Sequence, residues 1–562
     1  MVGKGRAMVT REMLSRLVES DPAFELVTEK RGGRTQTNYG NVAGSLRELA
    51  ANLSSFGDSV AIKVEQRSVT YAELWGDIVA AAHWFRAQGV GPGERVAMLA
   101  RNGIELSVAF WASQAIGAVF VPLNTSWTAA EVHYALSDCD PTLVVTAAEL
   151  YDRIPDEFRG RVVAIGPVGA RAREVIRIWE DVVAGRHHRD LPEAAVASDH
   201  PATIVYTSGT TGRPRGVVHT HGNHCVAVCN SSITAAAVQL LFGPPAAAGD
   251  RAAVLQVLPW FHVAGLGAMY TSLLAGVENV VMPRWNAAEA VRIIGEERIT
   301  SLGGVPTMLG QLLVEEKQNG NADLSSLRMV SSGATAVPAT LVRAVENGVG
   351  RQATLLTGYG LTETTASIAL SVGSDLFERP ESVGYPYPVN AVRIVDDDGK
   401  HVPAGQIGQI WVSGPTVAQG YWRDPEATRA AFTNGGFCTG DLGYVDRDGY
   451  LFIAGRIKDV IIRGGENIQA AEVEQVVAEL EPIMDIAVVG LPHPSLGEEV
   501  VAVIDVYPGA SITDAEIDAH CRERLAKFKI PSRYIRDVPI PRNATGKSLK
   551  RVLRESLISD PA

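Results

Sequence analysis

Cysteine is scarce in this sequence of 562 residues, and cationic charge is not in excess. The five cysteines form no CxxC pair, which argues against a disulfide framework or a zinc ribbon and predicts a reducing, cytoplasmic location. The net charge is −12, so no general electrostatic attraction to nucleic acid or to an anionic membrane is expected. No apolar signal-peptide core follows Met1. The 46% hydrophobic and 20% charged residues are typical of a globular chain.

Lysine is also scarce, and none stands between Lys63 and Lys317. A chain that otherwise uses arginine can keep lysine where a compact, mobile ammonium is needed, although a solvated basic face explains most of these positions equally well. The last fifth of the chain contains Lys458, Lys527, Lys529, Lys547 and Lys550.

Two long uncharged stretches, Leu106–Trp127 and Ala252–Val277, could be mistaken for membrane spans. Each contains residues that interrupt a spanning helix, such as Pro122 and Pro259. We therefore predict that each is a buried helix together with a buried strand, and that the chain has no transmembrane segment.

Short apolar stretches alternate with helical ones from Ser59 to about Ile453, which predicts an α/β fold with mainly parallel sheets. The elements expected in this part are strands at 60–64, 95–100, 119–123 and 142–145 and a helix at 71–88. After Gly455 the pattern changes to a helix at 471–480, strands at 485–490 and 499–506, and a helix at 514–525. The predicted organisation is a lead-in segment at 1–50, a large N-terminal domain at 51–457 and a small α+β C-terminal domain at 458–562.

Residues 204–216, with the sequence IVYTSGTTGRPRG, form the strongest local motif. An apolar strand ends in a loop of hydroxyls and glycines, and a helix is expected from Asn223. Glycines let backbone N–H groups converge on a phosphate, the hydroxyls add donors, and Arg215 adds charge. The loop is not a Walker A motif because no GK[ST] closes it. The alternative is an ordinary glycine-rich turn.

Residues 357–364, with the sequence TGYGLTET, form a second motif, in which an aromatic ring could stack on a base and a carboxylate could hold Mg²⁺. The GKS at 546–548 is not a P-loop, because Pro541 stands where that pattern needs glycine. Further short motifs are Thr439–Asp441, Gly455–Asp459, Gly464–Asn467 and Asn543–Lys547.

The order of these motifs resembles the adenylate-forming superfamily of acyl-CoA synthetases, luciferase-like enzymes and peptide-synthetase adenylation domains. The resemblance runs from Thr70 to Lys547, nearly the whole chain. It implies a large N-terminal domain of parallel sheets and a small, mobile C-terminal domain that rotates between two half-reactions, with a hinge at Lys458. It also implies an ATP-dependent ligase that joins a carboxylic acid to CoA, with ATP, Mg²⁺ and CoA as its cofactors.

The same resemblance implies a role for each motif residue. The catalytic residues would be Lys547, Thr362, Glu363 and His262, with Thr207 and Glu363 at the metal. The nucleotide would contact Thr207, Ser208, Gly209, Thr210, Thr211, Gly212, Arg215, Gly333, Ala334, Thr335, Gly358, Tyr359, Gly360, Asp441 and Arg456. The pantetheine of CoA would contact Arg463, Gly464, Gly465 and Phe528. Arg215 stands where the superfamily usually has lysine, which retains the charge.

The chemistry suits these residue types. A carboxylate is a poor electrophile, and its attack on the α-phosphate of ATP gives an acyl-adenylate and pyrophosphate. Charge builds on phosphate oxygens in that step, and Mg²⁺ and a lysine supply the opposite charge. A thiol then displaces AMP, so no protein nucleophile is required, in keeping with the absence of a Gly-x-Ser-x-Gly elbow.

Residues 258–265, with the sequence LPWFHVAG, resemble the acyl-pocket motif of the superfamily. Amino-acid-activating members place an aspartate here to pair with the ammonium, and none follows Phe261. An apolar, roomy pocket for a fatty or arylalkyl acid is therefore predicted, although a helix-packing seam uses the same small residues and His262 could be a core histidine. The predicted lining is Trp260, Phe261, His262, Ala264, Gly265, Val305 and Met308.

Several alternatives stay open at this point. His221, His224, Cys225 and Cys229 have metal-like spacing, but a buried helix after the phosphate loop explains them better. The acceptor could be a carrier-protein phosphopantetheine instead of CoA. A non-catalytic nucleotide-binding member and a luciferase-like oxygenase are less favoured. The expected partners are small molecules, and the chain could form a homodimer.

Overall fold

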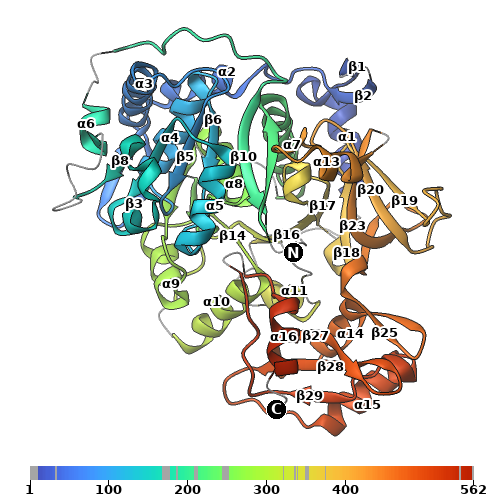
Figure 1. The fold of residues 1–562 in the computed structure, drawn as a ribbon. Helices are drawn as coiled ribbons and strands as arrows, with labels where there is room; N and C mark the ends of the chain where they lie inside the picture. The colour runs from blue at the N-terminus through green and yellow to red at the C-terminus, as the bar shows by residue number, and fades with distance from the viewer. Residues whose placement is uncertain are drawn as a thin grey trace.

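The computed structural model has two parts of unequal size, joined after β24 (Leu451–Arg456) (Figure 1). The N-terminal part is built around two large sheets, and the C-terminal part around a third. The residues described are 10–31, 34–167, 177–184, 188–207, 213–242, 252–319, 322–333, 337, 339–347, 353–373, 375–433, 435–543 and 546–559.

The first sheet has the order β21-β11-β10-β6-β5-β7-β8-β9 among the described residues. Its strands from β9 to β10 are parallel, whereas β11 is antiparallel to both of its neighbours. Thr207 therefore ends a parallel strand, and the next strand begins at Arg215, where only a helix from Asn223 was expected. The bounds are β5 (Arg95–Leu99), β6 (Val119–Pro122), β7 (Leu143–Ala147), β8 (Val162–Ile165), β9 (Arg177–Ile178), β10 (Pro201–Thr207), β11 (Arg215–Thr220) and β21 (Gly420–Tyr421).

The second sheet is parallel in one half and antiparallel in the other. The parallel half comprises β3 (Val60–Val64), β12 (Ala253–Gln256), β13 (Glu278–Val281), β14 (Ser301–Gly304), β15 (Met329–Ser332) and β16 (Thr354–Tyr359), with β4 (Arg67–Thr70) antiparallel at its edge. The antiparallel half comprises β17 (Ala369–Val372), β18 (Ser382–Pro386), β19 (Ala391–Val395), β20 (Gly408–Ser413), β22 (Phe432–Thr433), β23 (Gly436–Val445) and β24.

The antiparallel half corrects the expectation that strand–helix alternation continues to Ile453. Tight turns replace crossover helices at two places. The N–H of Gly399 donates to the carbonyl of Asp396, and that of Gly449 donates to the carbonyl of Asp446. Both glycines have positive φ, of 76° and 91°, which this residue adopts without steric cost. Antiparallel strands can be joined by such short turns, whereas parallel strands cannot.

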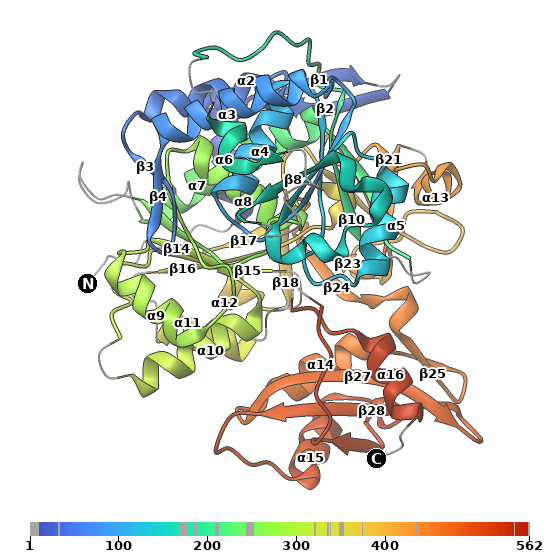
Figure 2. The same ribbon diagram turned by 60° about the vertical axis from the view of Figure 1, so that its left-hand side comes forward.

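Helices cover the sheets on several sides (Figures 1 and 2). Helices α4 and α8 share a buried core with both sheets, through Val96 and Val119 of the first and Ile62 and Val281 of the second. Helices α9, α10 and α11 pack on the parallel half of the second sheet in a separate core. The bounds are α2 (Leu46–Ala50), α3 (Tyr71–Ala87), α4 (Ile104–Ala115), α5 (Ala129–Cys139), α6 (Trp179–Val183), α7 (His221–Phe242), α8 (Val263–Leu274), α9 (Ala287–Glu296), α10 (Pro306–Gln318), α11 (Ala339–Asn347), α12 (Asp375–Glu378) and α13 (Pro425–Ala431).

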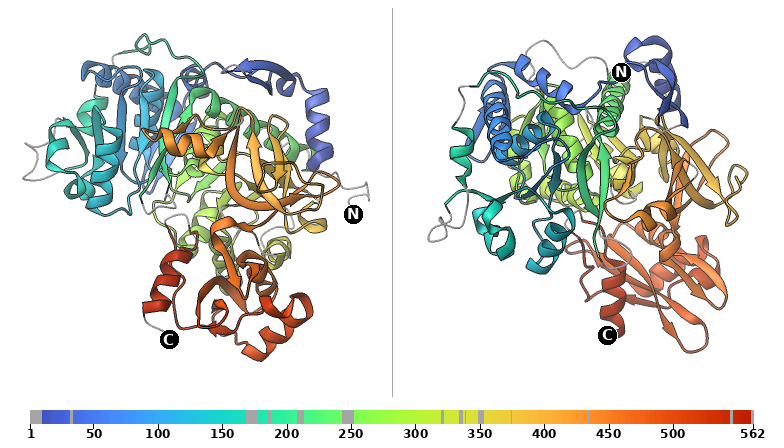
Figure 3. Two further views of the ribbon diagram at one scale, coloured as in Figure 1. Left: turned by 45° about the vertical axis from the view of Figure 1, so that its right-hand side comes forward. Right: turned by 45° about the horizontal axis from the view of Figure 1, so that its top comes forward.

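The described part of the lead-in segment packs into the N-terminal domain (Figure 3). It forms α1 (Thr10–Ser20) and a hairpin of β1 (Leu26–Arg31) and β2 (Arg34–Tyr39). Met13, Leu14 and Tyr39 join a core with α7 and β17, and the hydroxyl of Tyr39 donates to Asn230 Oδ1 at 2.8 Å. This segment therefore packs against α7 and stabilises its position.

The two uncharged stretches form α4 with β6 and β12 with α8, which confirms a buried helix and a buried strand in each. Within the part that the structure describes, α7 alone is long and apolar enough to cross a membrane by length and composition. It contacts α1, α8 and β17, as a core helix does. His221, His224 and Cys225 lie buried in it, and no metal-binding group of three such residues occurs among those described.

The C-terminal domain has the sheet order β26-β25-β28-β27, with β29 paired to β28, and stands apart from the two larger sheets (Figure 2). All four of the elements expected after Gly455 are present. The bounds are β25 (Val460–Arg463), β26 (Glu466–Gln469), α14 (Ala470–Ala478), β27 (Ile483–His493), β28 (Gly497–Val506), α15 (Asp514–Arg524), β29 (Arg533–Ile535) and α16 (Lys550–Ser559).

Candidate active site

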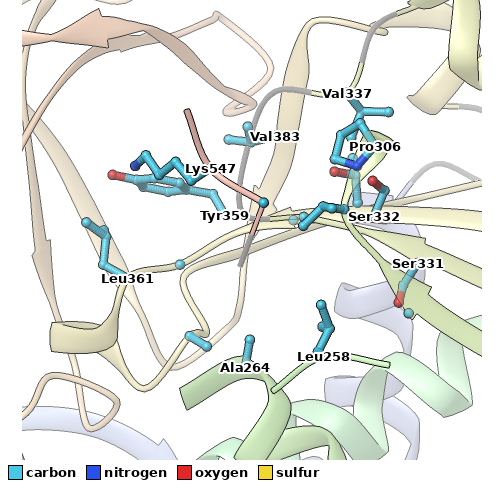
Figure 4. Close-up of a pocket in the computed structure, with 18 of the residues that line it drawn as sticks. Leu258, Ala264, Pro306, Ser331, Ser332, Val337, Tyr359, Leu361, Val383 and Lys547 are labelled. Atoms are coloured by element: carbon cyan, nitrogen blue, oxygen red, sulfur yellow. The ribbon is translucent and has the colours of Figure 1, made fainter. Parts of the chain in front are cut away.

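A cavity of about 1910 Å³ lies where the C-terminal domain faces the ends of β14, β15 and β16. Figure 4 shows part of it: Leu258 and Ala264 lie on one side, while Lys547 of the C-terminal domain lies beside the ring of Tyr359. A cavity at the carboxyl ends of parallel strands is the usual ligand site of open α/β sheets. This position brings side chains of both domains together.

A buried carboxylate, Asp441, anchors one wall of the cavity. The antiparallel pairing of β23 and β24 places Arg456 directly across from it. Arg456 Nε lies 2.8 Å from Asp441 Oδ1, and the hydroxyl of Tyr359 donates to Oδ2 at 2.5 Å. Only 3% of Asp441 is exposed. The carboxylate is therefore fixed in place from two sides, by a guanidinium and by a phenol hydroxyl.

A second carboxylate, that of the half-buried Glu363, lies in a short 3₁₀ turn, η6 (Thr362–Thr364). The hydroxyl of Tyr421 donates to Glu363 Oε1 at 2.9 Å, and the guanidinium of Arg215 lies 5.5 Å from the centre of the Tyr421 ring. Burial raises the pKa of Glu363. A cation bound at this carboxylate would offset the cost of burying its charge.

Lys547 enters the cavity from a tight loop at the end of the chain. The loop is closed by Asn543, whose N–H donates to the carbonyl of Lys547 at 3.0 Å and whose Oδ1 accepts from the Lys547 N–H at 2.9 Å. Arg542 pairs with Asp485 and donates to the carbonyl of Gly546, which ties the loop to β27. Burial, with Arg456 nearby, lowers the pKa of Lys547 to about 8. At pH 7 most of the side chain is therefore still an ammonium, which can pair with an anion bound in the cavity.

The other end of the cavity is bounded by the start of α8. His262 is the residue before this helix, lines the cavity, and has a pKa lowered to about 4 by burial, so its ring is neutral at pH 7. Gly265 is required here, because a Cβ would lie 2.2 Å from the carbonyl oxygen of Pro259. The lining residues that the described parts of α7, α8, β12, β14 and β15 contribute carry no ionised side chain.

The residues at the cavity suit ATP and a divalent cation. Mg²⁺ is usually held by one or two carboxylates together with substrate phosphates, and Glu363 supplies a carboxylate in the cavity that Thr207 also lines. Ser332 lines the cavity with 4% of its surface exposed, and its hydroxyl has no hydrogen-bond partner among the described residues. Such an atom needs a ligand or water.

Comparison with known proteins now decides the family. A family profile described as AMP-binding enzyme matches residues 49–422, and one described as the AMP-binding enzyme C-terminal domain matches residues 472–547. This chain belongs to the AMP-binding enzyme family. The superfamily expected from the motifs is thereby confirmed, and so is its division into a large and a small domain.

The relatives of this AMP-binding enzyme include several acid–CoA ligases. A long-chain-fatty-acid–CoA ligase of Mycobacterium tuberculosis is 34% identical over 491 residues, which cover 87% of this chain and 93% of the relative. An indoleacetate–CoA ligase of Aromatoleum aromaticum is 34% identical over 497 residues, covering 88% and 94%. The structure of ATP-bound MatB from Rhodopseudomonas palustris matches with a TM-score of 0.78 at 32% identity, covering 91% and 99%. CoA ligases of this family use ATP, Mg²⁺ and CoA, which confirms the expected cofactors.

Most of the described residues predicted at the site line the cavity of this AMP-binding enzyme, but three of those expected in the acyl pocket do not. Trp260 is fully buried in the core shared by α4 and α8, Phe261 packs against the ring of His262, and Met308 packs in the core of α9 to α11. These three lie outside the lining of the cavity, and their place in the acyl pocket stays a prediction. The lining includes Thr207, Arg215, His262, Ala264, Gly265, Val305, Gly333, Gly358, Tyr359, Gly360, Thr362, Glu363, Asp441, Arg456, Lys458 and Lys547.

The residues expected at the pantetheine lie outside this cavity. Arg463 of β25 donates to the carbonyl of Phe528 at 2.6 Å, and Gly464 and Gly465 form the turn to β26. Ser208, Gly209, Thr210, Thr211, Gly212, Ala334 and Thr335 fall outside the described residues.

Two glycines that were expected to contact the nucleotide are also required by the packing of the backbone. A Cβ on Gly358 would lie 2.6 Å from the carbonyl oxygen of Ala369, and one on Gly360 would lie 2.2 Å from the carbonyl carbon of Ala366. Gly358 therefore lets β16 and β17 approach each other, and Gly360 lets the segments that follow β16 and precede β17 do the same.

Sequence reasoning missed Tyr421 as a partner of Glu363 and Asp485 as a partner of Arg542. The sequence around Tyr421 carries no sign of what its hydroxyl contacts. Asp485 falls within a predicted strand and had no distinguishing signal.

Proposed function

We propose that this AMP-binding enzyme joins an uncharged, mainly apolar carboxylic acid to CoA through an acyl-adenylate. The single observation that carries the proposal is the division of one cavity into two ends. Asp441, Arg456, Glu363 and Lys547 gather at one end, and the walls from α7, α8, β12, β14 and β15 contribute no ionised side chain at the other.

In the first half-reaction a carboxylate oxygen of the acid attacks the α-phosphorus of ATP, and pyrophosphate leaves. The Lys547 ammonium neutralises charge on the carboxylate and α-phosphate oxygens as that charge redistributes. Asp441, held by Tyr359 and Arg456, accepts hydrogen bonds from the ribose hydroxyls. Mg²⁺, when bound at Glu363 and Thr207, supplies further positive charge to the phosphates.

In the second half-reaction the thiol sulfur of CoA attacks the acyl carbonyl carbon, the bond from that carbon to the phosphate oxygen breaks, and AMP leaves with the oxygen. The thiol proton passes to solvent. We infer that the small domain rotates about Lys458 between the two steps, which removes Lys547 and brings Gly464 and Gly465 to the pantetheine path. The turn between β25 and β26, which contains both glycines, lies outside the cavity in the present arrangement. This position supports a role for the turn in the second half-reaction only.

The uncharged walls support the substrate class. A second carboxylate or an ammonium on the acid would be buried there without an opposite charge, which costs several kcal/mol. The lining also contains neutral polar groups, among them Ser231, Thr234 and Gln239 of α7. Hydroxyl, ether or ring N–H substituents are therefore compatible with the pocket, whereas ionised ones are not.

Matched pairs of acids test this proposal. Acid-dependent pyrophosphate release is measured for dodecanoate against dodecanedioate and for 3-phenylpropanoate against phenylalanine. The uncharged member of each pair is expected to have a kcat/KM at least about a hundredfold higher. Equal use of the charged member would refute the pocket interpretation, and release from neither pair would refute the substrate class.

The acceptor is tested separately, with CoA against a phosphopantetheine-bearing carrier protein. We propose free CoA, because the relatives reported above are named as CoA ligases; transfer to the carrier protein alone would refute it.

None of the five cysteines, all of which are described, forms a disulfide, which supports a reducing, cytoplasmic location. A homodimer stays a prediction.

A further inference from the structure

The segment that carries Glu363 has a backbone that needs support. After η6, Thr365 and Ala366 have φ of 51° and 58°, in the left-handed region that residues with a Cβ rarely adopt. For a β-branched residue such as Thr365 this conformation is a marked outlier. Strained conformations persist only where the surroundings hold them. The contacts of this turn therefore decide where the Glu363 carboxylate lies.

Besides the hydrogen bonds within the turn and the one from Tyr421 to Glu363, three hydrogen bonds hold it to neighbouring segments. Thr365 Oγ1 donates to the carbonyl of Thr416 at 2.7 Å, and the N–H of Ala418 donates to the carbonyl of Glu363 at 2.9 Å. The third comes from a histidine: His219 Nε2 lies 2.7 Å from the carbonyl oxygen of Thr362, which also accepts from the Thr365 N–H at 3.2 Å.

His219 begins a chain of buried polar groups that reaches α8. Its Nδ1 lies 3.1 Å from Thr203 Oγ1, which lies 2.9 Å from His224 Nε2, and His224 Nδ1 lies 3.2 Å from the hydroxyl of Tyr270. Tyr270 belongs to α8, the helix whose first turn lines the cavity at Ala264. All four side chains are at most 1% exposed.

Every proton in this chain has one possible place. The carbonyl of Thr362 can only accept, so His219 Nε2 carries the proton. Because the ring is buried among neutral partners, it is neutral, and its Nδ1 accepts from the Thr203 hydroxyl. That hydroxyl has then used its proton and accepts from His224 Nε2. His224 Nδ1 in turn accepts from Tyr270. One carbonyl therefore fixes both histidine tautomers.

We propose that His219 is a positioning residue for the Glu363 carboxylate, and that Thr203, His224 and Tyr270 hold the proton on the ring nitrogen that supports Thr362. This inference rests on the proposed role of Glu363 at the metal. It assigns a role to His224, one of the residues whose spacing suggested a metal site; no group of three residues that could hold a metal ion occurs among those described.

The test compares His219→Leu, His219→Gln and Thr203→Val with the unmodified full-length protein. Leucine removes the donor, whereas the amide of glutamine can place an N–H near the position of Nε2. Valine at 203 removes the hydroxyl that fixes the tautomer but leaves the ring in place. Glu363→Gln serves as the reference for lost metal binding.

Two quantities are measured. The first is amide hydrogen exchange at Thr365 and Ala366 without any ligand, and the second is the Mg²⁺ concentration for half-maximal pyrophosphate release. His219→Leu is expected to accelerate the exchange and to raise the Mg²⁺ requirement by about tenfold to a hundredfold each, the range for one buried partner left unsatisfied. His219→Gln should stay within about threefold of the unmodified protein, and Thr203→Val should fall between them. The KM for the acid should change much less.

Unchanged exchange and an unchanged Mg²⁺ requirement in a folded His219→Leu protein would overturn the proposal, and so would a His219→Gln protein as impaired as the leucine variant. If the leucine variant does not fold, an unchanged Thr203→Val protein overturns it. The exchange measurement needs no catalysis. Absence of acid-dependent pyrophosphate release in the unmodified protein would therefore refute the proposed function and still leave exchange to decide the support of the turn.

Discussion

Replacement of Lys547 by alanine should separate the two half-reactions. Its ammonium lies at the charged end of the cavity but belongs to the C-terminal domain, in a loop held by Asn543 and by the Arg542–Asp485 pair. Loss of one such preorganised charge is expected to slow adenylation by about 10²–10³, or roughly 3–4 kcal/mol. Thioester formation from a synthetic acyl-adenylate should survive, because the proposed rotation of the domain would remove Lys547 from that step.

The pKa of Lys547 adds a second signature. With a pKa of about 8, Lys547 is charged below that pH and loses its charge as pH rises through it. The charged fraction falls from about nine-tenths at pH 7 to about one-tenth at pH 9, so kcat/KM for adenylation should fall about tenfold over this interval. Lys547→Arg should retain part of the activity and lose this alkaline limb, since a guanidinium stays protonated.

The assay measures pyrophosphate release from acid and ATP, and CoA consumption with synthetic acyl-adenylate, from pH 6 to pH 9.5. Gly465→Leu should show the reverse pattern, because it adds bulk on the proposed pantetheine path. Gly465 has a φ of 88°, so Gly465→Ala is the control that carries the same backbone strain without the bulk. If Lys547→Ala and Gly465→Leu each lose both activities equally while folded, domain alternation does not operate in this enzyme.

Two further substitutions test the nucleotide site and the backbone packing at the start of α8. Asp441→Ala should raise the KM for ATP more than it lowers kcat, because a ribose contact acts in the ground state and the transition state alike; an unchanged KM would remove Asp441 from the ribose. Gly265→Ala should destabilise the protein by about 1–3 kcal/mol, since its Cβ would overlap Pro259, whereas Gly267→Ala, whose nearest neighbour would be the Tyr270 hydroxyl at 3.7 Å, should be neutral or stabilising in thermal unfolding.

The sequence was sufficient to predict the elements of the small domain, because these depend on local patterns, whereas the charged end of the cavity was expected from the resemblance to a known superfamily. The elements after Gly455 have regular apolar spacing, and Asp441 and Lys547 sit in short motifs with a fixed order. The antiparallel half of the second sheet was missed although its turns at Asp396–Gly399 and Asp446–Gly449 were visible as turn sequences. Strand–helix alternation was expected to continue through both turns to Ile453, so no antiparallel strands were predicted there.

The contacts of side chains could not be predicted in the same way. Tyr421 reaches Glu363 from 58 positions away, and His219 reaches Thr362 from 143. A motif also does not say which way each of its residues faces: Trp260 stands between lining residues in the chain and points into the core. The direction in which each of these side chains faces depends on how α8 packs between the two sheets, and no local sequence pattern predicts that packing.

The central claim is that the acid is activated by transfer of its own oxygen to the α-phosphate of ATP. The most direct test uses an uncharged acid with ¹⁸O in its carboxylate, together with ATP, Mg²⁺ and CoA, and examines the products by mass spectrometry. The account predicts AMP that carries one ¹⁸O, unlabelled pyrophosphate, and the acyl-CoA. Production of ADP with the label in orthophosphate, or AMP without the label, would contradict it.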